Sequence, residues 1–403
     1  MSATVRFAAP ILAAVVCLLL SSRALSDDAK LKGLLSQGVA RGYPGMAMII
    51  VGPDGERRSA SAGYADIERG RPMRVDDSFH LASITKTFTA VATLRLVDQG
   101  KLSLDATLKD VLGNAVARIP NADRITVAQL LDHSSGIYPT NNDMDYLTTL
   151  LGPKADPEKV WTPQRMIALA DKDRQQPVDV PGGGHHYSDT NYILLGMIVE
   201  KLSGRPLKAQ VTRTILRPLG MSSTYYYSDH LPRTWGLASV PTVQGYLLAT
   251  SDIRSAIAIN PMFKPVAGRM KGDAQLLNST LAAERMDATA GVVTTLPDCA
   301  RYARALFGGK LLSPKSQAFL MAAGEGMDAL AIDRHRTWTL QAMHKSYGVL
   351  VYKEGDGPGG VNTLMAYLPA KREIFIGFTN IFGNFDEVDF MMDKVIGPMA
   401  EGH

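Results

Sequence analysis

The spacing of apolar residues predicts strands near both ends of the chain. Residues 46–51 form a short apolar run that ends in a Gly-Pro-Asp-Gly turn, and a second extended stretch follows over 57–64. This pattern predicts an antiparallel hairpin. The strand pattern returns near the C-terminus, over residues 347–352, 363–367 and 374–379.

Between these strands the pattern is mainly helical and is interrupted by proline and glycine. Strands at both ends around a helical middle predict an α/β (α+β) fold with one antiparallel sheet built from both chain ends and flanked by helices. We expect the sheet lobe over residues 27–109 and 286–403, and an inserted, mainly helical lobe over 110–285. The best candidate helices are 27–41, 83–98, 126–133, 163–171, 190–203 and 386–399.

The first residues are typical of a secretory signal peptide. Arg6 precedes an apolar run over residues 7–20, and Ala24 and Ser26 place small residues before a cleavage point ahead of Asp27. The run is short for a bilayer span, although an uncleaved anchor is the alternative. We therefore expect a signal peptide over 1–26 and a periplasmic or secreted bacterial domain over 27–403. We expect no stable membrane span after cleavage.

Charge and cysteine content narrow the classes of partner. The chain has 43 basic and 39 acidic residues, and removal of Arg6 and Arg23 with the signal peptide leaves 41 against 39, or +2. This even balance does not predict binding to nucleic acid or to an anionic membrane. The mature chain keeps one cysteine, Cys299, so an intramolecular disulfide is excluded. We expect a monomer whose partner is a small-molecule or peptide substrate.

Ser83-Ile84-Thr85-Lys86 stands at the head of a predicted helix. Residues three apart at a helix start share a face, so the Lys86 ammonium can reach the Ser83 hydroxyl. A serine needs a neighbouring base to take its proton, and lysine can be that base when its pKa is lowered. Backbone N–H groups at the helix start can supply half of an oxyanion hole. The alternative is a capping serine beside a solvated lysine.

Tyr187-Ser188-Asp189 is the second candidate group. A tyrosine near two cations can be partly ionised and can move a proton to or from a leaving group. Asp189 can bind Lys86 or a substrate amide; the alternative is a helix N-cap at Asp189 and a packing role for Tyr187. The adjacent His185 and His186 point apart on most backbones, so we expect neither a metal site nor a cofactor.

These residues carry a resemblance to a known family. The chain resembles the serine β-lactamase and DD-peptidase superfamily, on the branch of class C β-lactamases, class VIII esterases and D-stereospecific peptidases. Ser83 to Lys86 resembles its first motif, and Tyr187-Ser188-Asp189 its Tyr-x-Asn second motif. The resemblance implies a β-lactamase/transpeptidase-like fold and a catalytic set of Ser83, Lys86 and Tyr187. Other similar segments are 100–105, 130–136, 192–196, 217–221, 290–295 and 366–369.

The second motif departs from the family pattern. It ends in Asp189 where the family usually has asparagine. A carboxylate beside Lys86 raises the lysine pKa and weakens it as a base. Asn191 is an alternative source of the amide.

The third motif, Lys/His-x-Gly, has two alignments. Lys353-Glu354-Gly355 matches it literally, whereas counting back from Val361 without gaps puts Glu354 at the basic position. We favour Lys353, because the site needs a cation to bind a substrate carboxylate and to keep Tyr187 acidic. A solvated charge pair on an edge strand is the alternative. In either alignment, the backbone N–H near Asp356 would complete the oxyanion hole.

The resemblance implies acyl transfer through an acyl-enzyme. We expect an ester or amide substrate, including D-amino-acid peptides and β-lactam-like molecules, and an activity of the esterase or DD-peptidase type. The alternatives are a β-lactamase, or a catalytically weak envelope protein that uses the same fold for binding. The chain has no Gly-x-Ser-x-Gly motif, which argues against an α/β-hydrolase. The sequence does not define the natural substrate.

Overall fold

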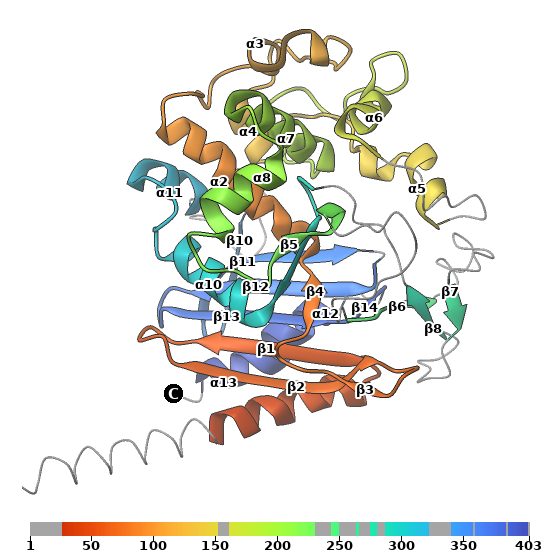
Figure 1. Ribbon diagram of the computed structural model, residues 1–403, viewed down its shortest axis with the longest axis vertical. Coiled ribbons are helices and arrows are strands. Elements are labelled where there is room, and N and C mark those ends of the chain that lie inside the picture. The colour runs from red at the N-terminus through yellow and green to blue at the C-terminus, as the bar shows by residue number, and fades with distance from the viewer. Residues whose placement is uncertain are drawn as a thin grey trace, which may run out of the picture.

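A seven-stranded antiparallel sheet lies at the centre of the protein (Figure 1). The computed structural model describes residues 26–151, 161–229, 243–249, 263–265, 275–279, 287–321, 340–357, 359–383 and 386–401. Residues 1–25 of the predicted signal peptide lie outside the described residues. The strand order is β10-β11-β12-β13-β1-β2-β3. The strands are β1 (Gly45–Val51), β2 (Arg57–Asp66), β3 (Arg71–Pro72), β10 (Gln341–Lys345), β11 (Gly348–Gly357), β12 (Val361–Leu368) and β13 (Glu373–Thr379).

The sheet joins the two ends of the chain, as the apolar pattern predicts. β1 pairs with β2 in the expected hairpin, and on its other side β1 pairs with β13, Met46 opposite Thr379. β10, which the sequence pattern did not indicate, adds an edge strand next to β11. The predicted sheet is confirmed, with strands that extend beyond several of the predicted segments.

Both faces of β1 are buried, which explains its unbroken apolar sequence. Ala47, Ile49 and Val51 contribute to the core on the side of the helices that follow Ser83. Met46 and Ile50 point the other way, into a second core beneath the terminal helices. The sheet is therefore the middle layer of three.

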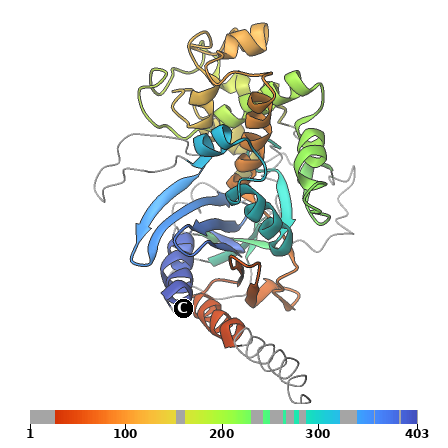
Figure 2. The same cartoon turned by 90° about the vertical axis from the view of Figure 1, so that its left-hand side faces the viewer.

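Most helices gather on one side of the sheet (Figures 1 and 2). α7 packs against α2 and α4 there, and its first residues carry part of the candidate site. The helices on this side are α2 (Thr85–Asp98), α3 (Leu108–Leu112), α4 (Val127–Leu131), α5 (Met144–Leu151), α6 (Pro163–Ile167), α7 (Asp189–Ser203), α8 (Leu207–Val211), α10 (Leu296–Phe307) and α11 (Pro314–Met321). The short helical segments are η1 (Ala82–Ile84), η2 (Gly113–Val116), η3 (Thr140–Asn142), η4 (Ala168–Ala170), η5 (Thr212–Leu216) and η6 (Tyr227–Asp229).

The interval 110–285 is less uniformly helical than the sequence pattern suggested. Its described residues include the strands β5 (Tyr225–Tyr226), β6 (Gly245–Ala249), β7 (Phe263–Pro265) and β8 (Gln275–Ser279). Runs this short do not distinguish strand from helix by periodicity. β6, β7 and β8 form a sheet with β14 (Ile381–Phe382), and β5 pairs with β9 (Val292–Thr295), which also pairs with β4 (Ser78–His80).

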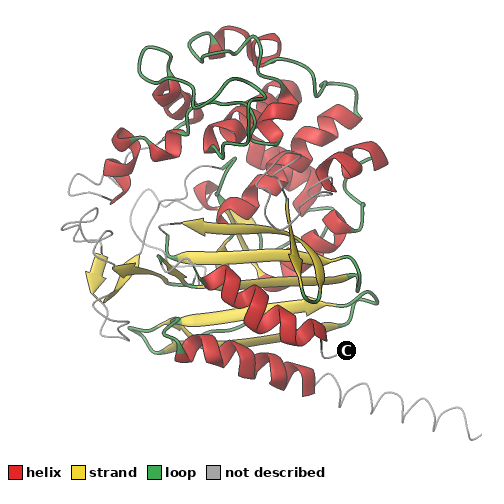
Figure 3. Ribbon diagram, turned by 180° about the vertical axis from the view of Figure 1, so that it is seen from behind, coloured by secondary structure: helices red, strands yellow, loops and turns green. Residues whose placement is uncertain are grey.

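Helices from both termini cover the other face of the central sheet (Figure 3). The first helix spans 26–40, and the last segment contains α12 (Glu387–Phe390), η7 (Met391–Ile396) and α13 (Gly397–Glu401). Lys30 Nζ donates to the Pro398 carbonyl oxygen at 2.7 Å, which links the two. None of the helices in the described residues combines the length and apolar character needed to cross a bilayer.

Candidate active site

Ser83 lies at the junction between a strand and a helix. β4 leads to Leu81, whose N–H donates to the Val292 carbonyl oxygen at 2.9 Å, and η1 and α2 follow. Ala82, the residue before Ser83, has a φ of 46°, an unusual value for a residue with a Cβ. Such backbone strain persists only where the surroundings hold it, and here it fixes the exit angle of Ser83.

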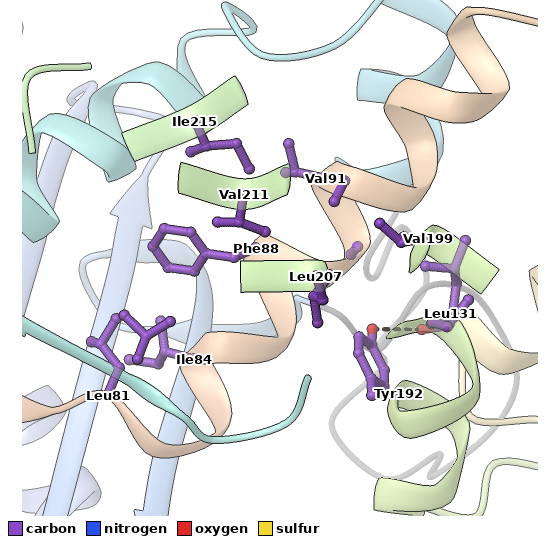
Figure 4. Close-up of a cluster of buried hydrophobic side chains, with 14 of the residues drawn as sticks. Leu81, Ile84, Phe88, Val91, Leu131, Tyr192, Val199, Leu207, Val211 and Ile215 are labelled. Atoms are coloured by element: carbon purple, nitrogen blue, oxygen red, sulfur yellow. Dashed lines mark hydrogen bonds between the residues drawn. The ribbon is translucent and has the colours of Figure 1, made fainter. Parts of the chain in front are cut away.

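The helix behind Ser83 is held by the largest apolar core. Ile84, Phe88 and Val91 are fully buried and lie among side chains from α4, α7, α8 and η5 (Figure 4). In the same cluster, the Tyr192 hydroxyl of α7 donates to the Leu131 carbonyl oxygen at 3.1 Å. The first turns of α2 and α7 are therefore fixed relative to one another, which positions the side chains they carry.

The structure brings the first and second motifs together at the Ser83 hydroxyl. Lys86 Nζ donates to Ser83 Oγ at 2.9 Å, and the Tyr187 hydroxyl lies 2.8 Å from the same oxygen. Lys86 also donates to the carbonyl oxygen of Thr289 at 3.2 Å and is only 1% exposed. Tyr187 remains 39% exposed, so the group is accessible from solvent.

Asp189 forms a close ion pair with Lys86. Its Oδ1 lies 2.7 Å from Lys86 Nζ. Burial alone would lower the pKa of Lys86, but the attraction of Asp189 and the contact with Tyr187 outweigh it, and the net pKa is raised. Lys86 is therefore protonated near neutral pH, and its amine is a base only in the fraction that has lost the proton.

Replacing Asp189 by asparagine should move the pH dependence of the reaction. Asp189→Asn removes the main group that raises the pKa of Lys86, so the neutral amine forms at lower pH. We expect the rising limb of kcat/KM for a neutral ester to shift down by about one pH unit or more. A pH profile of both proteins, carried from pH 5 to above pH 10 for as long as they stay folded, measures this. A limb that stays in place would mean that Lys86 is not the base.

The neighbours of Tyr187 do not make it acidic. Lys86 Nζ and Lys353 Nζ lie 5.1 and 5.3 Å from the centre of the Tyr187 ring. Partial loss of solvent around Tyr187 raises its pKa by more than Lys86 lowers it, so the phenol, which is ordinarily neutral near pH 7, is protonated there. The expectation of a partly ionised Tyr187 is wrong for this reason. A neutral phenol is suited instead to donate a proton.

Asn191 does not reach Ser83. It is fully buried, accepts from the Ser135 hydroxyl at 2.5 Å and places its amide nitrogen 3.0 Å from His133 Nδ1. The Ser188 N–H also donates to His133 Nδ1, at 3.2 Å. Asn191 thus supports the second motif from behind and does not offer its amide to a substrate beside Ser83.

His133 is a site residue that the sequence reasoning did not single out. Its ring lies against that of Tyr187, with centroids 4.5 Å apart. Burial and the charge of Lys353 lower the pKa of His133 well below its usual value, so it is neutral and Nδ1 can accept both bonds. The only signal in the sequence was its place in the segment 130–136.

The structure distinguishes the two alignments of the third motif. Lys353 is 3% exposed and lies beside the Tyr187 ring, whereas strand alternation turns Glu354 to the opposite face. Burial, and then the charge of Lys86, lower the pKa of Lys353 to about 8. Lys353 therefore occupies the basic position on the side of the site, and it keeps its charge at neutral pH.

Gly355 brings β11 against the backbone of Ser83. A Cβ at this position would overlap the Leu81 carbonyl oxygen and come within 2.9 Å of the Ser83 backbone nitrogen. Asp356 follows and is exposed. The backbone after Gly355 thus lies next to the start of η1. The N–H near Asp356, which the sequence predicts as the second oxyanion donor, belongs to this stretch of backbone.

No group of three potential metal ligands among His, Cys, Asp and Glu occurs in the part of the chain that the structure describes. His185 and His186 take different partners. His186 Nε2 lies 2.9 Å from Asp179, and the His185 ring lies against that of His133.

Comparison with known proteins gives the family. A sequence model of the β-lactamase family matches residues 31–394. The chain belongs to the β-lactamase family. The proteins that it is similar to include an esterase, a putative D-alanyl-D-alanine carboxypeptidase and a D-amino acid amidase.

Individual relatives agree with this assignment. Esterase EstB of Burkholderia gladioli is 34% identical over 51% of this chain and 53% of its own length. Penicillin-binding protein 4* of Bacillus subtilis is 24% identical over 78% of this chain and 63% of its own length. The chain thus spans little more than half of the first of these proteins.

Solved structures show the same fold over nearly the whole chain. D-amino acid amidase from Ochrobactrum anthropi SV3, in complex with L-phenylalanine amide, superposes with a TM-score of 0.77 at 25% identity, covering 93% of this β-lactamase-family chain and 99% of the amidase. An octameric penicillin-binding protein homologue from Pyrococcus abyssi superposes with a TM-score of 0.72 at 22% identity, covering 93% and 78%.

Proposed function

We propose that this protein is an exported serine hydrolase that works through an acyl-enzyme on esters or on amides of D-amino acids and D-peptides. One observation carries the proposal: Ser83 Oγ is within hydrogen-bonding distance of both Lys86 Nζ and the Tyr187 hydroxyl. Ser83 is the nucleophile, Lys86 the base and Tyr187 the proton relay. The predicted signal peptide supports a periplasmic or secreted location, and a monomer remains our prediction.

Acylation begins with the fraction of enzyme in which Lys86 is neutral. Its amine takes the Ser83 proton as Oγ attacks the substrate carbonyl carbon, and the carbonyl oxygen becomes an oxyanion. The N–H groups of Ser83 and Asp356 are the proposed donors to that oxyanion. The Tyr187 hydroxyl donates its proton to the leaving group and regains one from Lys86.

Deacylation runs through the same groups in reverse order. Water takes the place of the leaving group beside Tyr187 and attacks the ester carbon while its proton passes through Tyr187 to Lys86. The bond between that carbon and Ser83 Oγ then breaks, Oγ takes the proton from Lys86, and the acid is released. Lys353 supports binding of a substrate carboxylate, since its Nζ lies over the Tyr187 ring, 5.3 Å from the ring centre. Its pKa of about 8 limits this contribution to neutral and acidic solutions.

A substrate panel on the protein lacking residues 1–26 tests the proposed class. We expect hydrolysis of p-nitrophenyl acetate and of D-phenylalanine amide, each with kcat/KM at least about tenfold above that for nitrocefin. A D-Ala-D-Ala peptide completes the panel. If none of the four substrates is hydrolysed, the binding scaffold becomes the better description.

A β-lactamase is the second candidate, and the placement of Lys353 favours it more than the sequence alone did. A cation at this position can bind the carboxylate of a penicillin. Mass spectrometry after mixing with benzylpenicillin separates the outcomes. Rapid release of ring-opened product indicates a β-lactamase, whereas a persistent adduct on Ser83 indicates a DD-peptidase.

A further inference from the structure

A buried hydroxyl on β12 links the two backbone segments that meet at the nucleophile. Thr363 is 1% exposed. Its Oγ1 lies 3.1 Å from the Leu81 carbonyl oxygen and 3.0 Å from the Gly355 carbonyl oxygen. One hydrogen serves both acceptors, so the hydroxyl bridges the segment before Ser83 and the strand of the third motif.

The Gly355 carbonyl shares a peptide with one proposed oxyanion donor, and the Leu81 carbonyl lies one peptide before the other. In a planar trans peptide the C=O and N–H bonds point in opposite directions. The Gly355 carbonyl therefore fixes the direction of the Asp356 N–H, which belongs to the same peptide. The Leu81 carbonyl fixes the backbone that enters the strained Ala82 and continues to the Ser83 N–H.

Gly355 shows how closely the three segments meet. In the register of β11 and β12, Gly355 lies opposite Thr363. A Cβ on Gly355 would come within 2.7 Å of Thr363 Oγ1 and 2.9 Å of the Ser83 nitrogen. The hydroxyl therefore fills the space that the glycine leaves, and a shift of either segment would change the separation of the two donors.

We propose that Thr363 is a positioning residue for the oxyanion hole, setting the distance and direction of the Ser83 and Asp356 N–H groups through the Leu81 and Gly355 carbonyls. It touches neither the substrate nor the reacting atoms. The inference rests on the proposed function, because it assigns the two N–H groups to an oxyanion.

Thr363→Val tests the inference because valine keeps the shape and removes the hydroxyl. Deleting one oxyanion donor costs about a hundredfold or more in kcat, so displaced donors should cost about tenfold to a hundredfold. We expect kcat/KM for an ester to fall by this factor. The Ki of a phenylboronic acid, which forms a tetrahedral adduct on a nucleophilic serine, should rise by a similar factor.

Thr363→Ser should stay within about threefold of the unmodified protein, because it keeps the hydroxyl. If Thr363→Val does not fold, the pair Thr363→Ser and Thr363→Ala makes the same comparison. Thr379→Val is the matched control: its hydroxyl is also buried and donates to a backbone carbonyl, that of Gly45, at 2.9 Å. It should lower Tm without changing the boronate Ki.

The outcomes separate this inference from the proposed function. If Ser83→Ala is inactive but Thr363→Val keeps kcat/KM and boronate Ki within twofold, Thr363 is only structural and the inference is overturned alone. If Ser83→Ala retains full turnover, the proposed function and this inference both fail. Loss in Thr363→Val with recovery in Thr363→Ser supports the inference.

Discussion

Ser83→Ala should lower kcat for ester hydrolysis by about four orders of magnitude or more, as expected when the nucleophile of an acyl-enzyme is removed. The lost atom is the one that Lys86 and Tyr187 both contact. Without it, the reaction has only the binding and electrostatic contributions of the site. Initial rates with p-nitrophenyl acetate at several enzyme concentrations measure the loss.

Ser134→Ala is a suitable control for this substitution. Ser134 lies on the neighbouring loop, where its hydroxyl donates to Asp132 at 2.6 Å and takes no part in the Ser83 group. Its kcat should stay within twofold. Equal turnover by Ser83→Ala and the unmodified protein would show that another residue carries the nucleophile.

Lys86→Met should lower kcat by about a thousandfold, because general base catalysis contributes about two to four orders of magnitude. Methionine fills a similar volume but accepts no proton. The substitution also leaves Asp189 beside a buried apolar chain without its ion-pair partner, so the free energy of unfolding should fall by about 1–3 kcal/mol. Steady-state kinetics and denaturant unfolding measure the two effects.

The double variant Lys86→Met/Asp189→Asn separates charge from chemistry. It removes the unpaired carboxylate, so the free energy of unfolding should recover towards that of the unmodified protein while kcat stays low. Lys101→Met, at an exposed position, is the control for loss of a lysine. If Lys86→Met keeps kcat within tenfold, Lys86 is not the base.

Local geometry made part of the site predictable from the sequence. Ser83 and Lys86 are three residues apart at a helix start, and this spacing alone brings their polar atoms together. The contact between Asp189 and Lys86 could also be predicted, on the assumption that the first and second motifs lie in the same site. The raised pKa of Lys86 was expected from the same contact, because a carboxylate stabilises the charged amine.

Other features depend on contacts that no local pattern encodes. The choice between Lys353 and Glu354 is decided by strand register, where Lys353 lies opposite Met365 in β12. Thr289 accepts from Lys86 across 203 positions of sequence. The ionisation of Tyr187 was predicted wrongly because two nearby cations are visible in a motif, whereas the burial that outweighs them is visible only in the fold.

The helical lobe shows the same limit at a larger scale. The predicted helices over 126–133, 163–171 and 190–203 were found within a few residues of their predicted bounds, because each carries a periodic apolar face. β6 and β8 were missed, since each is five residues long and pairs with strands elsewhere in the chain. Short strands are defined by their partners more than by their own sequence.

The most direct test of the central claim is to locate the acyl group. The enzyme is mixed with p-nitrophenyl acetate, quenched in acid within milliseconds to seconds, digested and analysed by fragment mass spectrometry. The account predicts the mass of one acetyl group on Ser83, in amounts that rise and decay with turnover. Turnover without acetyl on Ser83, or with acetyl that accumulates on Lys86 or Tyr187 instead, would contradict it.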